Sequence, residues 1–171
     1  MKVCKFEKIK DEDEMKQVIN CIQKEHPYVA VVPILAQLQE WLQAISISWF
    51  HEEDEVSHTT VNAIEAYCCT LANHLITDSH LNQEIKNRIL ECIKKIHILV
   101  EDKADLLIDK MIKAEVYGLS SDLFTYCLRQ QGLRAQTLDT GKLINPEKPD
   151  VPLNKNDAFQ KVQKRHVQEK R

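Results

Sequence analysis

Glycine is nearly absent from this chain. Only Gly118, Gly132 and Gly141 occur among its 171 residues, where average usage of about 7% predicts roughly 12. The first 117 residues contain none. A loop whose backbone N–H groups close around phosphate needs glycine, because a Cβ atom blocks the approach and disfavours positive φ. Any nucleotide chemistry in the amino-terminal part must therefore work without a glycine-rich phosphate loop.

The composition suits one globular domain. Hydrophobic residues make up 43% of the chain and charged residues 29%, as in ordinary folded proteins. The formal net charge of −3 predicts no binding to nucleic acid. No apolar run reaches the roughly 18 residues that a membrane span needs. The charged amino terminus is unlike a secretory signal, and the six cysteines lack C-x-x-C spacing. We therefore expect reduced, mostly buried thiols and a cytoplasmic location.

Strand and helix patterns alternate in the amino-terminal segment. Residues 2–6 predict a short strand, and Asp11 to His26 predicts an amphipathic helix with an acidic first turn. Pro27 ends this helix. Tyr28 to Leu35 is a continuous apolar run, which predicts a parallel strand covered on both faces. The order strand, helix, strand predicts a βαβ unit.

From about residue 36 to residue 117 the apolar residues recur at helical spacing. Asp78 or Ser79 is placed to cap a helix inside this region. The side chains expected to face the core are Leu38, Trp41, Leu42 and Ile45; Val61, Ile64, Cys68, Leu71 and Leu75; Ile85, Ile89, Cys92, Ile93, Ile96 and Val100; and Leu107, Met111 and Val116. These stripes predict a helical subdomain inserted after the βα start.

The remaining residues predict one more helix, a strand and a tail. Ser120-Ser121-Asp122 predicts a helix N-cap, and Gly132 lies where the residue following a helix belongs. Leu133 to Leu138 alternates with period two and predicts a third strand. We expect an α/β fold with a small parallel sheet in a single domain over residues 1–144. Residues 145–171 predict a proline-containing linker and a basic terminal helix.

His51-Glu52-Glu53-Asp54-Glu55-Val56-Ser57-His58 is the densest polar cluster. The seven-residue separation of the histidines excludes the H-E-x-x-H pattern of zinc proteases. On one continuous helix, His51, Glu55 and His58 would share a face and could hold a metal. An acidic loop or helix start facing solvent is the alternative, and we favour it because charge runs are usually exposed.

Two segments resemble the aspartate kinases of the amino-acid kinase superfamily. Lys2-Val3-Cys4-Lys5-Phe6 is similar to the Lys-Val-Leu-Lys-Phe that opens these enzymes. The sequence Tyr-Cys-Leu-Arg-Gln-Gln-Gly-Leu-Arg-Ala-Gln-Thr-Leu-Asp, residues 126–139, looks like the helix-glycine-strand segment that follows the family's catalytic Gly-Glu. The resemblance covers almost the whole chain and corresponds to the front portion of the kinase domain.

The resemblance implies ATP-dependent phosphorylation of L-aspartate to aspartyl phosphate, with ATP and Mg as cofactors. It places Lys5 at the family's phosphate-contacting lysine. The family's Gly-Gly-Thr-Ser is replaced by Glu7-Lys8-Ile9-Lys10, where the Glu7 carboxylate would repel phosphate oxygens. Pro33-Ile34 and Gln39 replace the Ser-Ala segment and a nearby threonine, and Val116-Tyr117 replaces the Gly-Glu. The family's nucleotide-binding half has no counterpart in this sequence.

These departures favour a catalytically impaired or inactive relative of aspartate kinase that acts through association. Phosphoryl transfer depends on positioning and electrostatic stabilisation, so Lys5 alone has nothing to act upon. We expect no cofactor, and a partner that is a second copy or a related kinase subunit, because a half-domain leaves a sheet edge open. One alternative is an active subunit that retains Lys5 and binds ATP and L-aspartate. The other is a helical interaction module without kinase ancestry.

Overall fold

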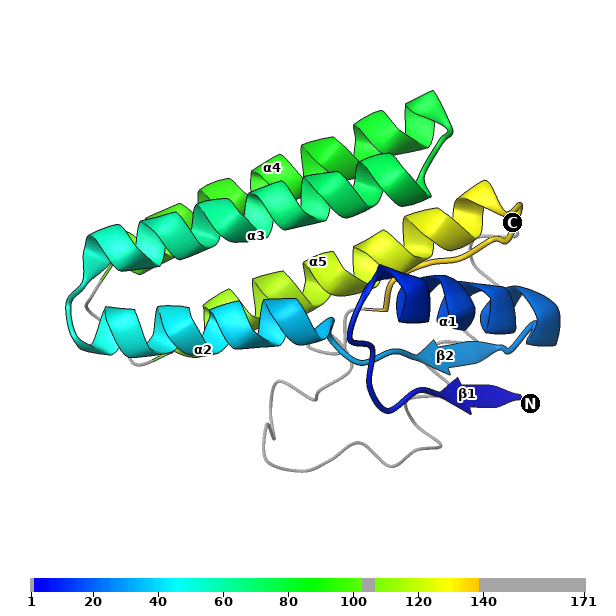
Figure 1. The fold of residues 1–171 in the computed structure, drawn as a ribbon, viewed down its shortest axis with the longest axis horizontal. Coiled ribbons are helices and arrows are strands. Elements are labelled where there is room, and N and C mark those ends of the chain that lie inside the picture. Colours follow the sequence, from blue (N-terminus) through cyan, green and yellow to red (C-terminus); the bar gives the residue numbers. More distant parts are fainter. Residues whose placement is uncertain (1, 103–106, 139–171) are drawn as a thin grey trace, which may run out of the picture. The chain divides into compact units, whose positions relative to one another are not determined.

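The computed structural model describes residues 2–102 and 107–138. Figure 1 shows the elements in chain order: β1 (Val3–Lys5), α1 (Glu12–Glu25), β2 (Val29–Val31), α2 (Ala36–Phe50), α3 (Asp54–Leu75), α4 (Ser79–Glu101) and α5 (Ile108–Gln130). All of them belong to the unit Met1–Thr137. The predicted linker and basic terminal helix at 145–171, and the end of the predicted domain 1–144, lie outside the described residues.

α1 forms where the acidic turn and the apolar spacing predicted it. Asp11 caps the helix, its Oδ1 accepting a hydrogen bond from the Glu14 backbone N–H at 2.9 Å. His26 ends the helix in the left-handed region, with φ of 44°, and Pro27 prevents continuation. The buried face consists of Met15, Val18, Ile19 and Ile22. The helix prediction is therefore confirmed.

β1 and β2 are parallel, with Val3 opposite Val29 and Lys5 opposite Val31. The face that carries Phe6 and Ala30 packs against the core. The other face is open: Val3 is 47% and Val31 46% exposed. The expectation that the second strand is covered on both faces is therefore wrong. A continuous apolar run does not distinguish a strand buried on both faces from a short strand that leads into a helix, as Val29–Val31 leads into α2.

α2 to α5 pack as a bundle, α2 against α3 and α5, α3 against α4, and α4 against α5 (Figure 1). All side chains predicted to face the core in α2, α3 and α4 are buried or pack on it. Asp78 caps α4 as predicted, accepting from the Leu81 N–H at 2.9 Å. At the start of α5 the predicted stripe is wrong, because Leu107 and Met111 are exposed and Ile108 is buried in their place.

α5 continues through the serine pair that was expected to cap a new helix. Ser120 is buried, and its Oγ lies 3.4 Å from the Leu35 backbone N–H, which donates to it. Asp122 binds Arg88 of α4. These side chains are used by other elements and do not cap a helix, so the N-cap prediction at Ser120-Ser121-Asp122 is wrong. The helical part, predicted over about residues 36–117, consequently extends to Gln130.

The predicted third strand at 133–138 does not form, and the sheet of the described residues contains β1 and β2 alone. The burial alternation is nevertheless real, because Leu133 and Ala135 pack on the core while Arg134 and Gln136 are exposed. The Ala135 carbonyl accepts from Arg129 Nε of α5 at 2.9 Å. The segment thus returns along α5. Period-two alternation indicates a half-buried segment and does not say whether it pairs with a sheet.

Gly118 and Gly132 provide a matched pair of substitutions. Gly132 has φ of 81° and follows α5, with the Leu133 N–H bound to the Leu128 carbonyl at 3.1 Å, whereas Gly118 lies inside α5. A Cβ at either position meets nothing within 4 Å, so backbone conformation alone decides the effect. We expect Gly118→Ala to stabilise the fold by about 0.5–1 kcal/mol and Gly132→Ala to destabilise it by about 1 kcal/mol. Urea unfolding would measure both, and equal signs would contradict the assignment of the helix end.

Candidate functional site

The carboxyl ends of β1 and β2 mark the place where the resemblance predicts a phosphate site. In open parallel α/β sheets, ligands bind beyond the carboxyl ends of the strands. Here the loops 6–10 and 32–35 follow the two strands, and Phe6 N–H still donates to the Val31 carbonyl at 3.0 Å. The chain therefore brings together the two loops that hold Glu7-Lys8-Ile9-Lys10 and Pro33-Ile34, two of the departures from the family pattern.

Ile9 lies in the loop after β1, beside the carboxyl ends of the two strands. Its side chain is fully buried in the core, in the loop where the kinase family has glycine. Its carbonyl oxygen accepts from the Ala36 backbone N–H at 3.0 Å. Ser120 Oγ accepts from Leu35 N–H. These two donors lie at the start of α2, where unpaired N–H groups would otherwise favour an anion. Both N–H groups therefore already donate to oxygen atoms of the chain itself, the Ile9 carbonyl and Ser120 Oγ.

Lys5 lies on the open face of the sheet. It is exposed, beside Val31 of β2, and has no ion-pair partner among the residues that the structure describes. Glu7, two residues further along, is also exposed. The assignment of Lys5 as a phosphate-contacting residue stays a prediction.

The structure brings together two of the other aligned positions. Tyr117 of α5 and Gln39 of α2 lie side by side, with the Tyr117 hydroxyl donating to Gln39 Oε1 at 3.4 Å. Val116 points the other way and is completely buried. A phenol and an amide are neutral, so the pair lacks the carboxylate that the resemblance predicts at this position for contact with the amino-acid substrate.

The cluster His51 to His58 is split between two helices. His51 is the residue that ends α2, Glu52 has φ of 60°, and α3 begins at Asp54. The arrangement of His51, Glu55 and His58 on one helical face is therefore wrong, and the solvent-facing helix start is confirmed. Within residues 2–102 and 107–138, no group of three histidine, cysteine, aspartate or glutamate side chains could hold a metal ion.

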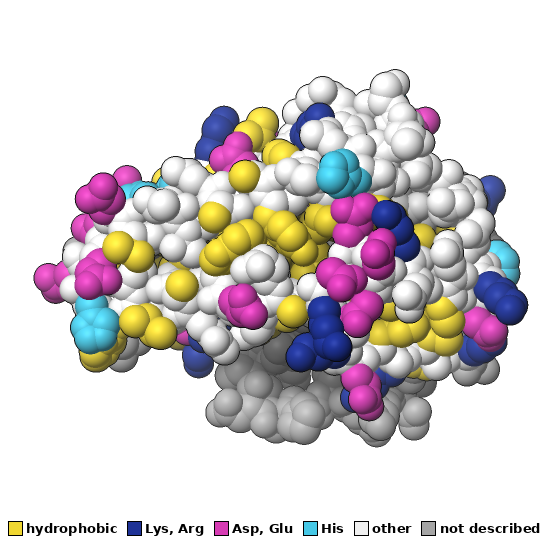
Figure 2. All heavy atoms as spheres, viewed as in Figure 1, with side chains coloured by type: hydrophobic (Ala, Val, Ile, Leu, Met, Phe, Trp, Pro, Cys, Tyr) yellow, Lys and Arg dark blue, Asp and Glu magenta, His cyan; other side chains and the backbone are white. Residues whose placement is uncertain are grey.

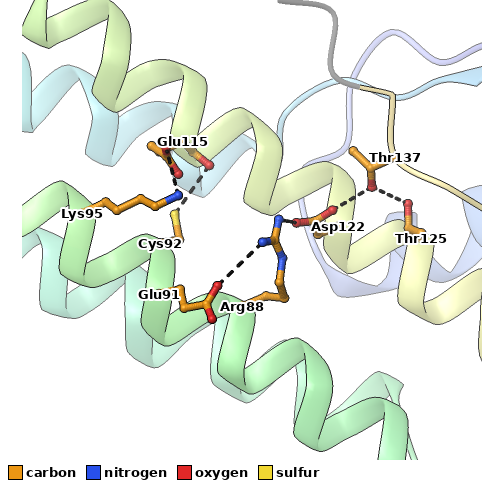
Figure 3. A network of polar contacts seen from close by, with 8 residues as sticks. All are labelled: Arg88, Glu91, Cys92, Lys95, Glu115, Asp122, Thr125 and Thr137. Atoms are coloured by element: carbon orange, nitrogen blue, oxygen red, sulfur yellow. Dashed lines mark hydrogen bonds and ion pairs between the residues drawn. The ribbon is translucent and has the colours of Figure 1, made fainter. Parts of the chain in front are cut away.

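A polar network joins α4, α5 and the segment after α5 (Figure 3). Asp122 accepts from Arg88 Nη2 at 3.1 Å and from the Thr137 hydroxyl at 2.7 Å. Thr137 also shares a 2.8 Å hydrogen bond with Thr125. The hydrogen bond to Asp122 raises the pKa of Arg88. The network is not visible in the sequence, because its members are up to 49 positions apart and no local spacing links them.

A second set of contacts joins the same two helices nearer the amino-terminal end of α5. Lys95 pairs with Glu115 at 3.6 Å, and Cys92 Sγ donates to the Glu115 carbonyl at 3.6 Å (Figure 3). Cys92 is buried and Glu115 half-buried, whereas Lys95 is exposed. We interpret both sets as structural, because each joins α4 to α5 or to the segment after it.

Three of the six thiols are buried and the other three half-buried, so the expectation of mostly buried thiols is confirmed in part. Cys68, Cys92 and Cys127 lie in the core, and all six cysteines of the chain are unpaired. Burial raises the pKa of Cys92 and of Cys127 to about 12, and raises that of Cys68 as well. The thiolate is the nucleophile, so these three cysteines are inert at neutral pH.

The described surface offers little that identifies a ligand. Figure 2 shows lysine and arginine side chains scattered among acidic ones on the face in view, with no basic patch there. No helix in the described ranges combines the length and the apolar character of a membrane span. Comparisons with models of known protein families, with curated proteins and with solved structures gave no match.

Proposed function

We propose that this protein is a non-catalytic relative of the aspartate kinases that acts by associating with another protein chain. The observation that carries the proposal is Ile9, whose side chain is buried and whose carbonyl oxygen binds the Ala36 N–H, in the loop that the resemblance assigns to phosphate binding. The βαβ order of β1, α1 and β2 is compatible with the front of that fold. The resemblance at residues 2–6 and 126–139 supplies the kinase ancestry.

The open sheet supports the association. β1 and β2 each have an outer edge that pairs with no other strand in the described residues. The open face of the sheet exposes Val3 of β1 and Val31 of β2. Unpaired strand edges are templates for pairing with another chain. The partner we propose is a second copy of this chain, with a related kinase subunit as the alternative.

A ligand-binding experiment tests the loss of catalysis. A ligand at one hundred times its dissociation constant stabilises a protein by about 2.7 kcal/mol. We expect Mg-ATP and L-aspartate, alone or together, to leave the thermal midpoint unchanged and to yield no aspartyl phosphate. A raised midpoint would favour the active alternative, in which case Lys5→Ala should abolish the shift while Lys8→Ala should not.

Sedimentation of paired variants tests the association. We expect a concentration-dependent dimer whose affinity falls at least tenfold in Val31→Lys, since a charge is then placed on the open sheet face. Ile98→Lys is the control, because Ile98 is 66% exposed on α4, away from the sheet. A monomer at every concentration, with no kinase subunit co-purifying, would contradict the proposal and favour a helical module without kinase ancestry. The helical module is supported by α2 to α5, which make up most of the described residues.

A further inference from the structure

Two histidines from neighbouring helices are in direct contact. His58 lies in the second turn of α3, and His97 lies near the end of α4. Their rings are stacked, with centroids 4.9 Å apart and planes inclined by 24°. The two Nδ1 atoms are 2.7 Å apart. At this separation one Nδ1 must donate a hydrogen and the other must accept it.

The neighbouring groups assign the protons. His97 Nε2 lies 3.1 Å from Asn62 Oδ1, and a carbonyl oxygen only accepts, so His97 carries its hydrogen on Nε2. His97 Nδ1 is then the acceptor, and His58 Nδ1 donates to it. His58 Nε2 lies 3.7 Å from Glu101 Oε1. His58 can therefore take up an extra proton on Nε2 beside a carboxylate without breaking its contact with His97.

We propose that His58 and His97 form an acid-sensitive joint between α3 and α4, which is closed while the pair carries at most one extra proton and opens when both rings are protonated. An imidazolium has two donors and no acceptor. Two imidazolium rings would direct N–H groups at each other across 2.7 Å and repel as like charges. The second proton, which must enter at His97 Nδ1, removes the only acceptor of the contact.

The charges around the joint determine the direction of its pH dependence. Burial, followed by the charge of His58, lowers the pKa of His97, and these effects outweigh Glu65 of α3 and Glu101 of α4, which act to raise it. In the described part of the chain, the charged groups that act on His97 all come from α3 and α4. The helices α2 and α5, which pack elsewhere on this pair, supply none.

The sign follows from proton linkage. An unfolded histidine has a pKa of about 6.5, and His97 in the folded protein has a lower one. The unfolded chain therefore binds this proton first as the pH falls. The stability that the joint supplies is present above about pH 6.5 and is lost as the pH falls through the folded pKa of His97.

A pH series with paired variants tests the joint. Because the pKa of His97 is lower in the folded protein than in the unfolded chain, the folding constant falls as the pH drops. We expect the folding constant of the full chain to fall by a larger factor between pH 7 and pH 5 than that of His97→Gln. His80→Gln is the control, because His80 is exposed at the other end of α4, where it pairs with Glu84. It should keep the unmodified pH dependence.

Nuclear magnetic resonance of the unmodified protein gives a readout that does not depend on folding of a variant. We expect His97 to be the Nε2–H tautomer at pH 7 and to titrate below the ordinary histidine value. Amide exchange in the last turn of α4 should accelerate below that pKa, while the first turn of α4 should be unaffected. A His97 that titrates at or above the ordinary value, or a pH dependence that is unchanged in His97→Gln, would overturn the proposal.

Discussion

Ile9→Ala is expected to lower the free energy of unfolding by about 2–5 kcal/mol, the usual cost of truncating a buried isoleucine. Ile9 is completely buried although it lies in a loop, so its side chain has no route to solvent and the cavity would be enclosed by the core. For a domain of this size the thermal midpoint should fall by on the order of 10 °C. Urea denaturation and calorimetry would measure the two quantities.

Lys8→Ala is the control for this loop, because Lys8 is the exposed neighbour of Ile9. It should change the free energy of unfolding by less than about 0.5 kcal/mol. Ile9→Ala should also fail to restore nucleotide binding, since the Ile9 carbonyl would still hold the Ala36 N–H and Glu7 would still be present. If Ile9→Ala lowered the free energy of unfolding as little as Lys8→Ala, the side chain of Ile9 would not fill the region at the carboxyl ends of the strands.

Asp122→Asn is expected to destabilise the fold by about 1–2 kcal/mol, because an amide cannot accept from Arg88 and Thr137 together. The aspartate side chain is only 15% exposed, whereas that of Arg88 is 54% exposed, so solvent screening reduces the electrostatic part. The segment 133–137 loses the hydrogen bond from Thr137 to Asp122 in this variant and keeps those to Arg129 and Thr125. Amide exchange and protease cleavage there should accelerate before the bundle unfolds.

Glu91→Gln is the matched control for the network. Glu91 also pairs with Arg88, at 3.7 Å, but its side chain is 63% exposed. Exposed pairs of this kind contribute about 0–1 kcal/mol, so the variant should leave both stability and the exchange of residues 133–137 nearly unchanged. Equal effects of Asp122→Asn and Glu91→Gln would show that the buried contact to Thr137 contributes nothing.

The helices were predictable wherever one local signal agreed with another. In α1 the cap at Asp11, the apolar spacing and Pro27 all indicated the same boundaries. Ser120-Ser121-Asp122 had the local chemistry of a cap, but Leu35 and Arg88, both far away in the sequence, bind these side chains. A single sequence does not reveal such distant partners, and the helix boundary was therefore predicted wrongly.

The phosphate site at the carboxyl ends of β1 and β2 stays a prediction. The replacement of the glycines of the aspartate kinase pattern was visible in the sequence, and so was the carboxylate at Glu7. That Ile9 would turn inward and bind Ala36 was not, because the direction of a loop side chain depends on the core it meets. The contact between His58 and His97 joins residues 39 positions apart, and no pattern along either helix indicates it.

The packing of α5 has a consequence for synthesis of the protein. α5 contacts α1, α2, α3 and α4, yet it is the last helix among the described elements. Until α5 has left the ribosome, the apolar faces of the earlier helices that pack on it are exposed to solvent. Partly folded chains of this kind aggregate or bind chaperones. A stop codon before residue 108 should therefore produce a polypeptide that is degraded and does not accumulate as a smaller folded protein.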